Sequence, residues 1–192
     1  MNRKQLYLWS LLLGLLGFAY LPSAQAVPFL VFQPTLQSFN QGDTVTVDVA
    51  VTGLGSEIVA AYDLDVAYDN SLLNAVSLSF GTNLGDPLSF ETLQSSNSLS
   101  PVVDLAEVSL LSDADLQALQ SSLGGTVVLA QIQFNALGAG DTSSLQFASG
   151  SEVKGANNQV IVNVSVPEPA TGLLLGAGLI PLVVGRKKAT VR

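Results

Sequence analysis

Four side chains that could act as oxygen ligands lie within one short stretch of the sequence: Asp63, Asp65, Asp69 and Asn70. Calcium takes roughly six to eight oxygen ligands. Strand residues two apart point to the same face, so Asp63 and Asp65 would present two carboxylates together, and a turn at Asp69 and Asn70 would add two more groups. These residues form a candidate calcium site. Their alternative role is a solvated sheet face. The sequence has no Asp-x-Asp-x-Asp-Gly loop, which excludes an EF-hand.

The residue types that most enzymes use are missing. The chain has no His and no Cys, which excludes imidazole bases, Ser-His-Asp triads, thiolate metal sites and disulfides. Lys154 is the only Lys between the two ends of the chain, and no base for a serine nucleophile is visible. Some pair of carboxylates is inevitable in a domain this acidic, so no pair indicates a glycosidase. We expect no enzyme activity and, apart from calcium, no cofactor.

Charge divides the chain into three parts. Residues 27–165 contain fourteen acidic residues and one Lys, which gives a net charge of −13. The remaining cations lie at the two ends of the chain. An acidic domain lacks the Lys and Arg residues that contact phosphates, so we expect no nucleic-acid partner.

Residues 1–26 have the organisation of a secretory signal peptide. Arg3 and Lys4 form a positive n-region, an apolar run spans residues 6–21, and Ala24 and Ala26 give the small-x-small pattern of a cleavage site. The run is short for a membrane span. We therefore expect signal peptidase to cleave after Ala26, with an uncleaved signal anchor as the alternative.

Residues 166–192 carry three elements in order: a Pro-rich motif, an apolar run over residues 172–185, and a basic cluster. The motif residues are Val166, Pro167, Glu168 and Pro169, and the cluster residues are Arg186, Lys187 and Lys188. The prolines keep the motif extended and out of a helix. Cations after the apolar run are typical of a cytoplasmic stop, which places the domain on the outer side of the membrane.

This order of elements resembles the PEP-CTERM sorting signal. The resemblance implies a transmembrane sorting helix that anchors the protein in the inner membrane of a Gram-negative bacterium until an exosortase processes it near the Pro-Glu-Pro motif. It also implies a host that makes exopolysaccharide, with the cell surface or the extracellular matrix as the final location. An ordinary C-terminal membrane anchor is the alternative.

Residues 27–165 form the domain, and their main signal is period-two alternation, which indicates strands with one buried face. The predicted inward residues are Val45, Val47, Val49 and Val51; Tyr62, Leu64, Val66 and Tyr68; Val76, Leu78 and Phe80; Val128, Ala130, Ile132 and Phe134; Leu145 and Phe147; and alternate positions of 160–166. Turn sequences rich in Gly, Asp and Asn separate the runs, with Asp43 and Asp141 as turn residues. This spacing predicts an all-β sandwich.

One helix is expected between two strands. Ser112 begins a sequence similar to a capping box, Leu116, Leu119 and Leu123 supply an apolar stripe, and Gly124 ends it. The only Trp, Trp9, lies in the signal peptide. The domain's tyrosines and the Phe residues at positions 80, 90, 134 and 147 are expected in the core.

Several motifs occur in a set order: Val45-x-Val47-x-Val49, Tyr68-Asp69-Asn70-x-Leu72, Ile132-x-Phe134-x-Ala136, Gly140-Asp141-Thr142 and Val160-x-Val162-x-Val164. With them, the domain resembles a cohesin-like domain. The resemblance implies a jelly-roll β-sandwich of about nine strands with one short helix. Cohesins of cellulosomes bind dockerins, which implies a binding role here.

Together these features predict a non-catalytic, exported binding module of the cell surface or extracellular matrix. Its ligand is an envelope protein or, alternatively, exopolysaccharide, and a structural matrix protein is the third possibility. Sugar rings are usually gripped by exposed aromatic faces. The domain keeps only Tyr62 and Tyr68 among its Trp and Tyr residues, and both lie in the apolar phase of their strand, which weakens the sugar-binding alternative.

Overall fold

The computed structural model describes residues 26–99 and 101–165. Ala24, the sorting motif Val166–Pro169, the apolar run and the basic cluster Arg186–Lys188 lie outside the described residues. None of the helices in the described part has the length and hydropathy of a membrane span.

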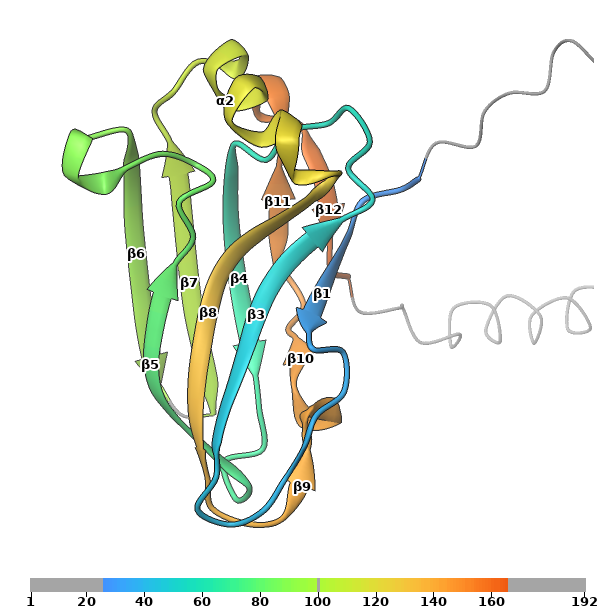
Figure 1. The fold of residues 1–192 in the computed structure, drawn as a ribbon, viewed down its shortest axis with the longest axis vertical. Coiled ribbons are helices and arrows are strands. Elements are labelled where there is room, and N and C mark those ends of the chain that lie inside the picture. Colours follow the sequence, from blue (N-terminus) through green and yellow to red (C-terminus); the bar gives the residue numbers. More distant parts are fainter. Residues whose placement is uncertain (1–25, 100, 166–192) are drawn as a thin grey trace, which may run out of the picture.

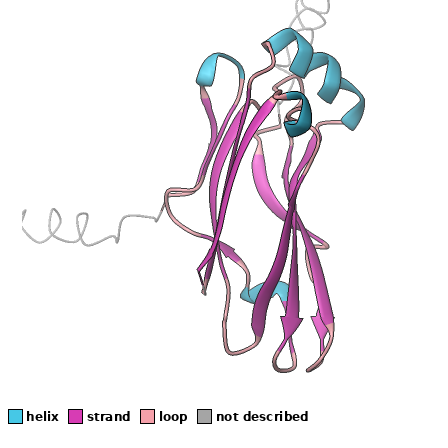
Figure 2. Cartoon of the chain, turned by 90° about the vertical axis from the view of Figure 1, so that its left-hand side faces the viewer, coloured by secondary structure: helices cyan, strands magenta, loops and turns pink. Residues whose placement is uncertain are grey.

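Two antiparallel sheets pack face to face (Figures 1 and 2). The first has the order β1 (Phe29–Gln33), β3 (Thr44–Thr52), β8 (Thr126–Ala136), β5 (Leu73–Phe80). The second has the order β12 (Val160–Asn163), β11 (Glu152–Lys154), β4 (Ala61–Ala67), β7 (Val102–Ser109), β6 (Thr92–Leu99), and β10 (Gln146–Phe147) also pairs with β4. Strands β2 (Ser38–Phe39) and β9 (Gly140–Asp141) form a small separate pair. This architecture confirms the predicted all-β sandwich.

The core lies between the sheets and follows the predicted alternation. Val45, Val47 and Val49 of β3 and Leu64 and Val66 of β4 are fully buried. Burying each such side chain contributes roughly 1.5–3 kcal/mol. Phe134 of β8 packs edge-on against Tyr68, with ring centroids 5.3 Å apart. All the strands and the buried core that the structure describes lie within residues 27–165.

Two β-bulges change which residues face inward. On β8 the register shifts beside Ala130, so that Val127 and Leu129 are buried and Val128 is not. On β5 it shifts between Ala75 and Ser77, and Val76 is exposed. The predicted inward positions Val128 and Val76 were therefore wrong, because a bulge adds one residue and reverses the phase. The structure describes residues 160–165 of the predicted strand over 160–166, and the strand ends at Asn163. Val160, predicted to face inward, is exposed, so that position was wrong.

The predicted helix is α2 (Asp113–Gln120), which lies at one end of the sandwich (Figure 1). The Ser112 hydroxyl accepts a hydrogen bond from the Asp115 amide at 3.3 Å, which is an N-cap. Leu116 is buried, but Leu119 is exposed, so the predicted apolar stripe was wrong at that position. A short 3₁₀ turn, η3 (Ser121–Leu123), follows α2, and Gly124 ends it in the left-handed conformation with φ 65°.

Gln120, at the end of α2, is buried instead of Leu119. Its side-chain carbonyl accepts the Val59 amide at 2.9 Å, and its NH₂ group donates to the backbone oxygens of Val59 and Asn83 at 2.8 and 3.0 Å. This one side chain satisfies buried backbone groups of two loops. It therefore attaches the helix to the end of the sandwich.

Candidate protein-binding face

The outer surface of β6, β7, β4 and β11 is a continuous face whose side chains are set by strand register. In its central row, Ser95, Ala106, Asp63 and Glu152 lie opposite one another across four strands. The next row toward one end contains Asn97, Asp104 and Asp65. The row toward the other end contains Leu93, Val108, Ala61 and Lys154. Small side chains, Ser95 and Ala106, lie beside the acidic ones in the central row.

Four carboxylates form an acidic band across this face: Asp63, Asp65, Asp104 and Glu152. Asp65 lies directly opposite Asp104, and Asp63 directly opposite Glu152. Like charges in directly opposed positions destabilise a sheet. Lys154, the only cation among the described residues, bonds Glu152 at 2.8 Å. The acidic band therefore favours a partner that brings cations.

An apolar corner adjoins the acidic band where β6 begins and β7 ends. It consists of five exposed side chains: Leu88, Phe90, Leu93, Val108 and Leu110. Leu93 pairs with Val108 across the two strands, and the Leu110 amide donates to the Glu91 carbonyl at 2.7 Å. The start of β6 therefore lies beside the end of β7 and the residue that follows it. Leu88 is 89% exposed and Phe90 83% exposed. Adjacent exposed apolar side chains on a folded domain mark an interaction site.

The turn that carries Leu88 and Phe90 is held in one conformation by its own hydrogen bonds. The Asp86 carboxylate accepts the Leu88 amide and the Ser89 hydroxyl, each at 2.9 Å. The Glu91 carboxylate accepts the Asp86 amide at 2.9 Å. Phe90 has φ 59°, a left-handed conformation that is rare for a bulky residue and costs energy. Phe90 was predicted in the core; this turn instead projects it into solvent.

A buried polar cluster lies beneath the face. Glu107 is 1% exposed, and its carboxylate accepts hydrogen bonds from the Tyr62 hydroxyl, the Thr92 hydroxyl and the Gln94 amide at 2.9, 2.7 and 2.8 Å. The Tyr62 hydroxyl also lies 3.0 Å from the Leu129 carbonyl of the other sheet. Burial, and then the neighbouring Glu107, raise the pKa of Tyr62. Tyr62 therefore stays protonated and donates. The cluster joins β6, β7 and β4 to β8.

The four residues of the predicted calcium site lie on β4 and in the turn that follows it. Asp63 and Asp65 lie on the outer face of β4 as expected, whereas Asp69 and Asn70 lie in the turn that follows β4. One oxygen of Asp69 accepts the Ser71 amide at 2.8 Å and the Ser71 hydroxyl at 2.6 Å, which lowers the pKa of Asp69. Within residues 26–99 and 101–165, no group of three acidic side chains is placed to hold a metal ion. Calcium binding stays a prediction.

Other expected roles of polar and aromatic residues are confirmed. Asp43 accepts the Asn40 amide at 2.8 Å, and Asp141 accepts the Ser143 amide at 2.8 Å, as turn residues do. Hydrogen bonds from Ser143 to the Asp141 carboxylate lower the pKa of Asp141. Tyr62 and Tyr68 are buried, as their phase predicted.

Sequence reasoning missed the apolar corner because it missed β6 and β7. Strand β6 is mostly polar, and the buried positions of β7 include Glu107, so neither shows clean apolar alternation. The signal that could have found the corner is the order of Pro87, Leu88 and Phe90: two large apolar residues in a segment with turn residues on both sides.

Comparison with known proteins agrees with this architecture. The family model described as Cohesin domain matches residues 31–168. The chain is similar to a type II cohesin domain from the cellulosome of Acetivibrio cellulolyticus, at 17% identity and a TM-score of 0.51, covering 76% of this chain and 94% of that one. A type I cohesin–dockerin complex from Clostridium thermocellum matches at 13% identity and a TM-score of 0.51, covering 73% and 94%.

A third solved structure, the sixth cohesin of scaffoldin B from Acetivibrio cellulolyticus in complex with a Cel5 dockerin mutant, matches at 16% identity and a TM-score of 0.50, covering 72% of this chain and 94% of that one. No curated protein sequence matches the chain. Likenesses at these identities establish the fold, and the family model covers most of the chain. Cohesins are typically extracellular or cell-surface modules. The chain belongs to the cohesin domain family, whose members are non-catalytic binding modules.

Proposed function

We propose that residues 27–165 bind a partner protein through the outer face of β6, β7, β4 and β11. The observation that carries this proposal is the apolar corner beside the acidic band on one face of the sheet. Buried apolar anchors surrounded by polar residues dominate the energy of most protein interfaces. Leu88, Phe90 and Leu93 would be those anchors. The acidic band would select and steer a cationic partner.

The partner class we propose is a dockerin-bearing protein of the cell envelope. Two of the solved cohesins that this fold resembles are in complex with dockerins. A partner that fits this face would place apolar residues against the corner and Lys or Arg against Asp63, Asp65 and Asp104. Calcium held at Asp63, Asp65, Asp69 and Asn70 is a second element of the proposal.

We also propose that the domain is exported and then sorted. The support is the sequence alone: the signal peptide with cleavage after Ala26, and the motif, apolar run and basic cluster of residues 166–192. An exosortase would process the inner-membrane form near Pro167-Glu168-Pro169. The domain would then reside at the cell surface or in the extracellular matrix. Intact-mass spectrometry in hosts with and without the exosortase tests this part: a mass that retains residues 170–192 in both hosts would reject processing.

The binding proposal is tested by retention on immobilised residues 27–165. Host envelope proteins and host exopolysaccharide are passed over it separately, each with calcium and with chelator. Leu93→Asp should abolish retention of the envelope protein. The control Val76→Asp, on an exposed Val of β5 in the other sheet, should leave it unchanged.

Each outcome has a distinct meaning. Equal loss in both variants would reject the face, because the effect would then not depend on location. Retention of polysaccharide without protein would replace protein binding with the carbohydrate alternative. Retention of neither would leave a structural matrix role. Loss with chelator would support a metal at Asp63 and Asp65.

A further inference from the structure

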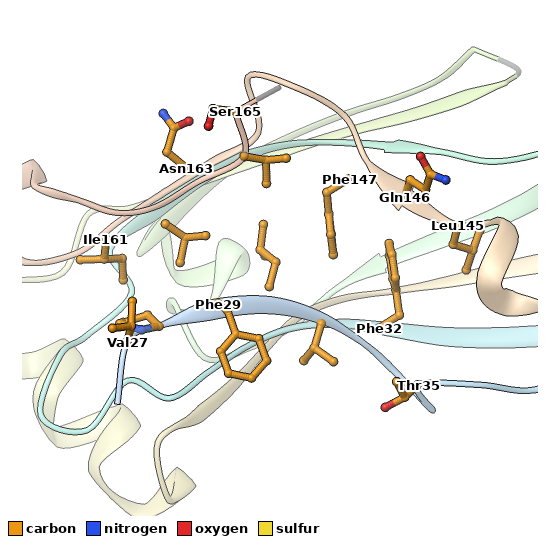
Figure 3. Close-up of a pocket in the computed structure, with 15 residues that line it drawn as sticks. Val27, Phe29, Phe32, Thr35, Leu145, Gln146, Phe147, Ile161, Asn163 and Ser165 are labelled. Atoms are coloured by element: carbon orange, nitrogen blue, oxygen red, sulfur yellow. The ribbon is translucent and has the colours of Figure 1, made fainter. Parts of the chain in front are cut away.

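An apolar groove runs between the edges of the two sheets (Figure 3). Its strands β1 and β12 lie on a different side of the sandwich from β6 and β7, which carry the apolar corner (Figure 1). Its volume is about 860 Å³, and it is lined by β1, β10 and β12 with the residues beside them. Leu30, Phe32, Phe147, Ile161 and Val162 supply partly buried apolar side chains. None of the fifteen described residues that line the groove is charged, although the domain around it has a net charge of −13.

Two of the strands that line the groove, β1 and β12, have a free edge. Among residues 26–99 and 101–165, β1 pairs only with β3, and β12 pairs only with β11. Each strand therefore has unpaired backbone N–H and C=O groups along its other side. These two edges belong to different sheets and border the same groove.

The edges of the two sheets differ in their protection against strand addition. Strands β5 and β12 each have a β-bulge, and β6 is composed mainly of Ser, Asn, Gln and Thr. Bulges discourage pairing at an edge. The sequences Phe-Leu-Val-Phe-Gln of β1 and Val-Ile-Val-Asn of β12 contain no charge, no Pro and no Gly. Strand β1, which pairs with β3 without a register shift, is therefore the more open template for another strand, and β12 is a shorter, bulged one.

Two aromatic rings stack across the groove. The rings of Phe32 and Phe147 lie 4.2 Å apart between centroids and are nearly parallel, at 5°. Figure 3 shows Phe32 pointing across the groove toward Phe147, while Phe29 points to the other side of β1. This stack fixes the spacing between the sheet edges, so the groove does not depend on an occupant for its width.

We propose that this groove binds an extended, apolar segment of another protein, with basic residues on either side of it, by strand addition to the free edges of β1 and β12. Alternating apolar side chains would enter between the sheets, and the backbone would pair with the edges. The net negative charge of the domain should attract a segment with basic residues at its ends and repel one with acidic residues there. The five residues of β1 fit a paired segment of about 17 Å.

The test uses synthetic peptides as probes. The first has alternating Val and Thr, one Trp and a Lys residue at each end; the second has Glu in place of both Lys residues; the third has Pro at its centre. Residues 27–165 contain no Trp, so the fluorescence of the peptide Trp reports binding without background. The Lys peptide should bind about tenfold more tightly than the Glu peptide at low salt, and added salt should reduce this ratio. The Pro peptide should lose binding, because Pro donates no hydrogen bond.

Hydrogen exchange locates the bound peptide. Amides of β1 and β12 should gain protection when the Lys peptide binds, and amides of β6 should not. Thr35 is an exposed residue of the groove wall outside the strands, which allows charge changes without disturbing the core. Thr35→Lys should weaken binding of the Lys peptide about threefold, and Thr35→Glu should strengthen it. Val76→Lys, on the edge strand β5, adds the same charge away from the groove and so controls for the net charge of the domain.

Three results would overturn this proposal. Equal binding of the Lys and Glu peptides would remove the argument from charge. Sedimentation of residues 27–165 as a dimer that peptide dissociates would make a second copy the occupant. Peptide binding by residues 27–165 but not by 27–192 would make the chain's own C-terminal segment the occupant. None of these results bears on the face of the proposed function, because Leu93→Asp lies outside the groove.

Discussion

Replacement of Glu107 distinguishes a hydrogen-bonding role from a charge role in the buried cluster. Its carboxylate accepts from Tyr62, Thr92 and Gln94, and no described cation lies with it. A buried charge without a counterion carries a desolvation cost. The hydrogen bonds must therefore supply the stabilisation, and a neutral acceptor of the same shape should replace the carboxylate.

Glu107→Gln retains every bond of the cluster. The amide oxygen accepts from Thr92 and Gln94. The amide NH₂ donates to the Tyr62 oxygen, whose own hydrogen turns to the Leu129 carbonyl at 3.0 Å. We expect the free energy of unfolding to change by about 1 kcal/mol or less. Glu107→Ala leaves the buried Thr92 hydroxyl without a partner and adds a cavity, which should cost about 3 kcal/mol.

Thermal and urea unfolding of residues 27–165 measure both variants. A loss of about 3 kcal/mol corresponds to a fall in Tm of roughly 10 °C for a domain of this size. Glu107→Ala should show that fall, and Glu107→Gln should stay within about 4 °C of the parent. If the two variants lose stability equally, the negative charge itself is required and the reasoning from hydrogen bonds is refuted.

Three further predictions concern single residues. Burial raises the pKa of Tyr62 in the folded domain, so above pH 10 this tyrosine ionises first in the unfolded chain. Its contribution to the free energy of unfolding should therefore fall there by about 1.4 kcal/mol per pH unit. Urea titrations at a series of pH values should show that Tyr62→Phe removes this contribution, and an unchanged pH dependence would contradict the prediction. Gln120→Ala removes three hydrogen bonds to Val59 and Asn83 and should cost about 2 kcal/mol in chemical unfolding, whereas Gln117→Ala on the exposed side of α2 should change little. Phe90→Gly relieves a left-handed residue and should raise the unfolding free energy by about 1 kcal/mol while weakening partner binding; lower stability would show that Phe90 is not strained.

The sequence predicts those strands whose inward residues are all apolar. Val45, Val47 and Val49 of β3 and Leu64 and Val66 of β4 lie where their alternation places them. Alternation fails at the bulges of β5 and β8, because the extra residue that forms a bulge cannot be recognised from the residue types of the strand. It fails for β7 because a buried Glu107 looks like a surface residue until its three donors on β4 and β6 are known.

The candidate binding face is likewise only partly predictable from the sequence. Asp63 and Asp65 are found from spacing, since a strand places both on one face. Their cross-strand neighbours Asp104 and Glu152 are distant in sequence, so the acidic band depends on pairing that no local pattern contains. The apolar corner likewise depends on the register between Leu93 and Val108.

The acidic band should cost stability in the free domain, and this cost can be measured at one pair. Asp65 and Asp104 lie directly opposite each other, so Asp65→Asn removes a like-charge contact and should raise the unfolding free energy by roughly 0.2–1 kcal/mol at low salt. The gain should shrink in 1 M salt because exposed charges are screened. Asp113→Asn is the matched control: Asp113 lies in the first turn of α2, where a negative charge is favourable, and its loss should lower stability. If Asp65→Asn stabilises the domain and also weakens the partner, the repulsion within the acidic band is maintained for binding, and a cationic partner is what relieves it.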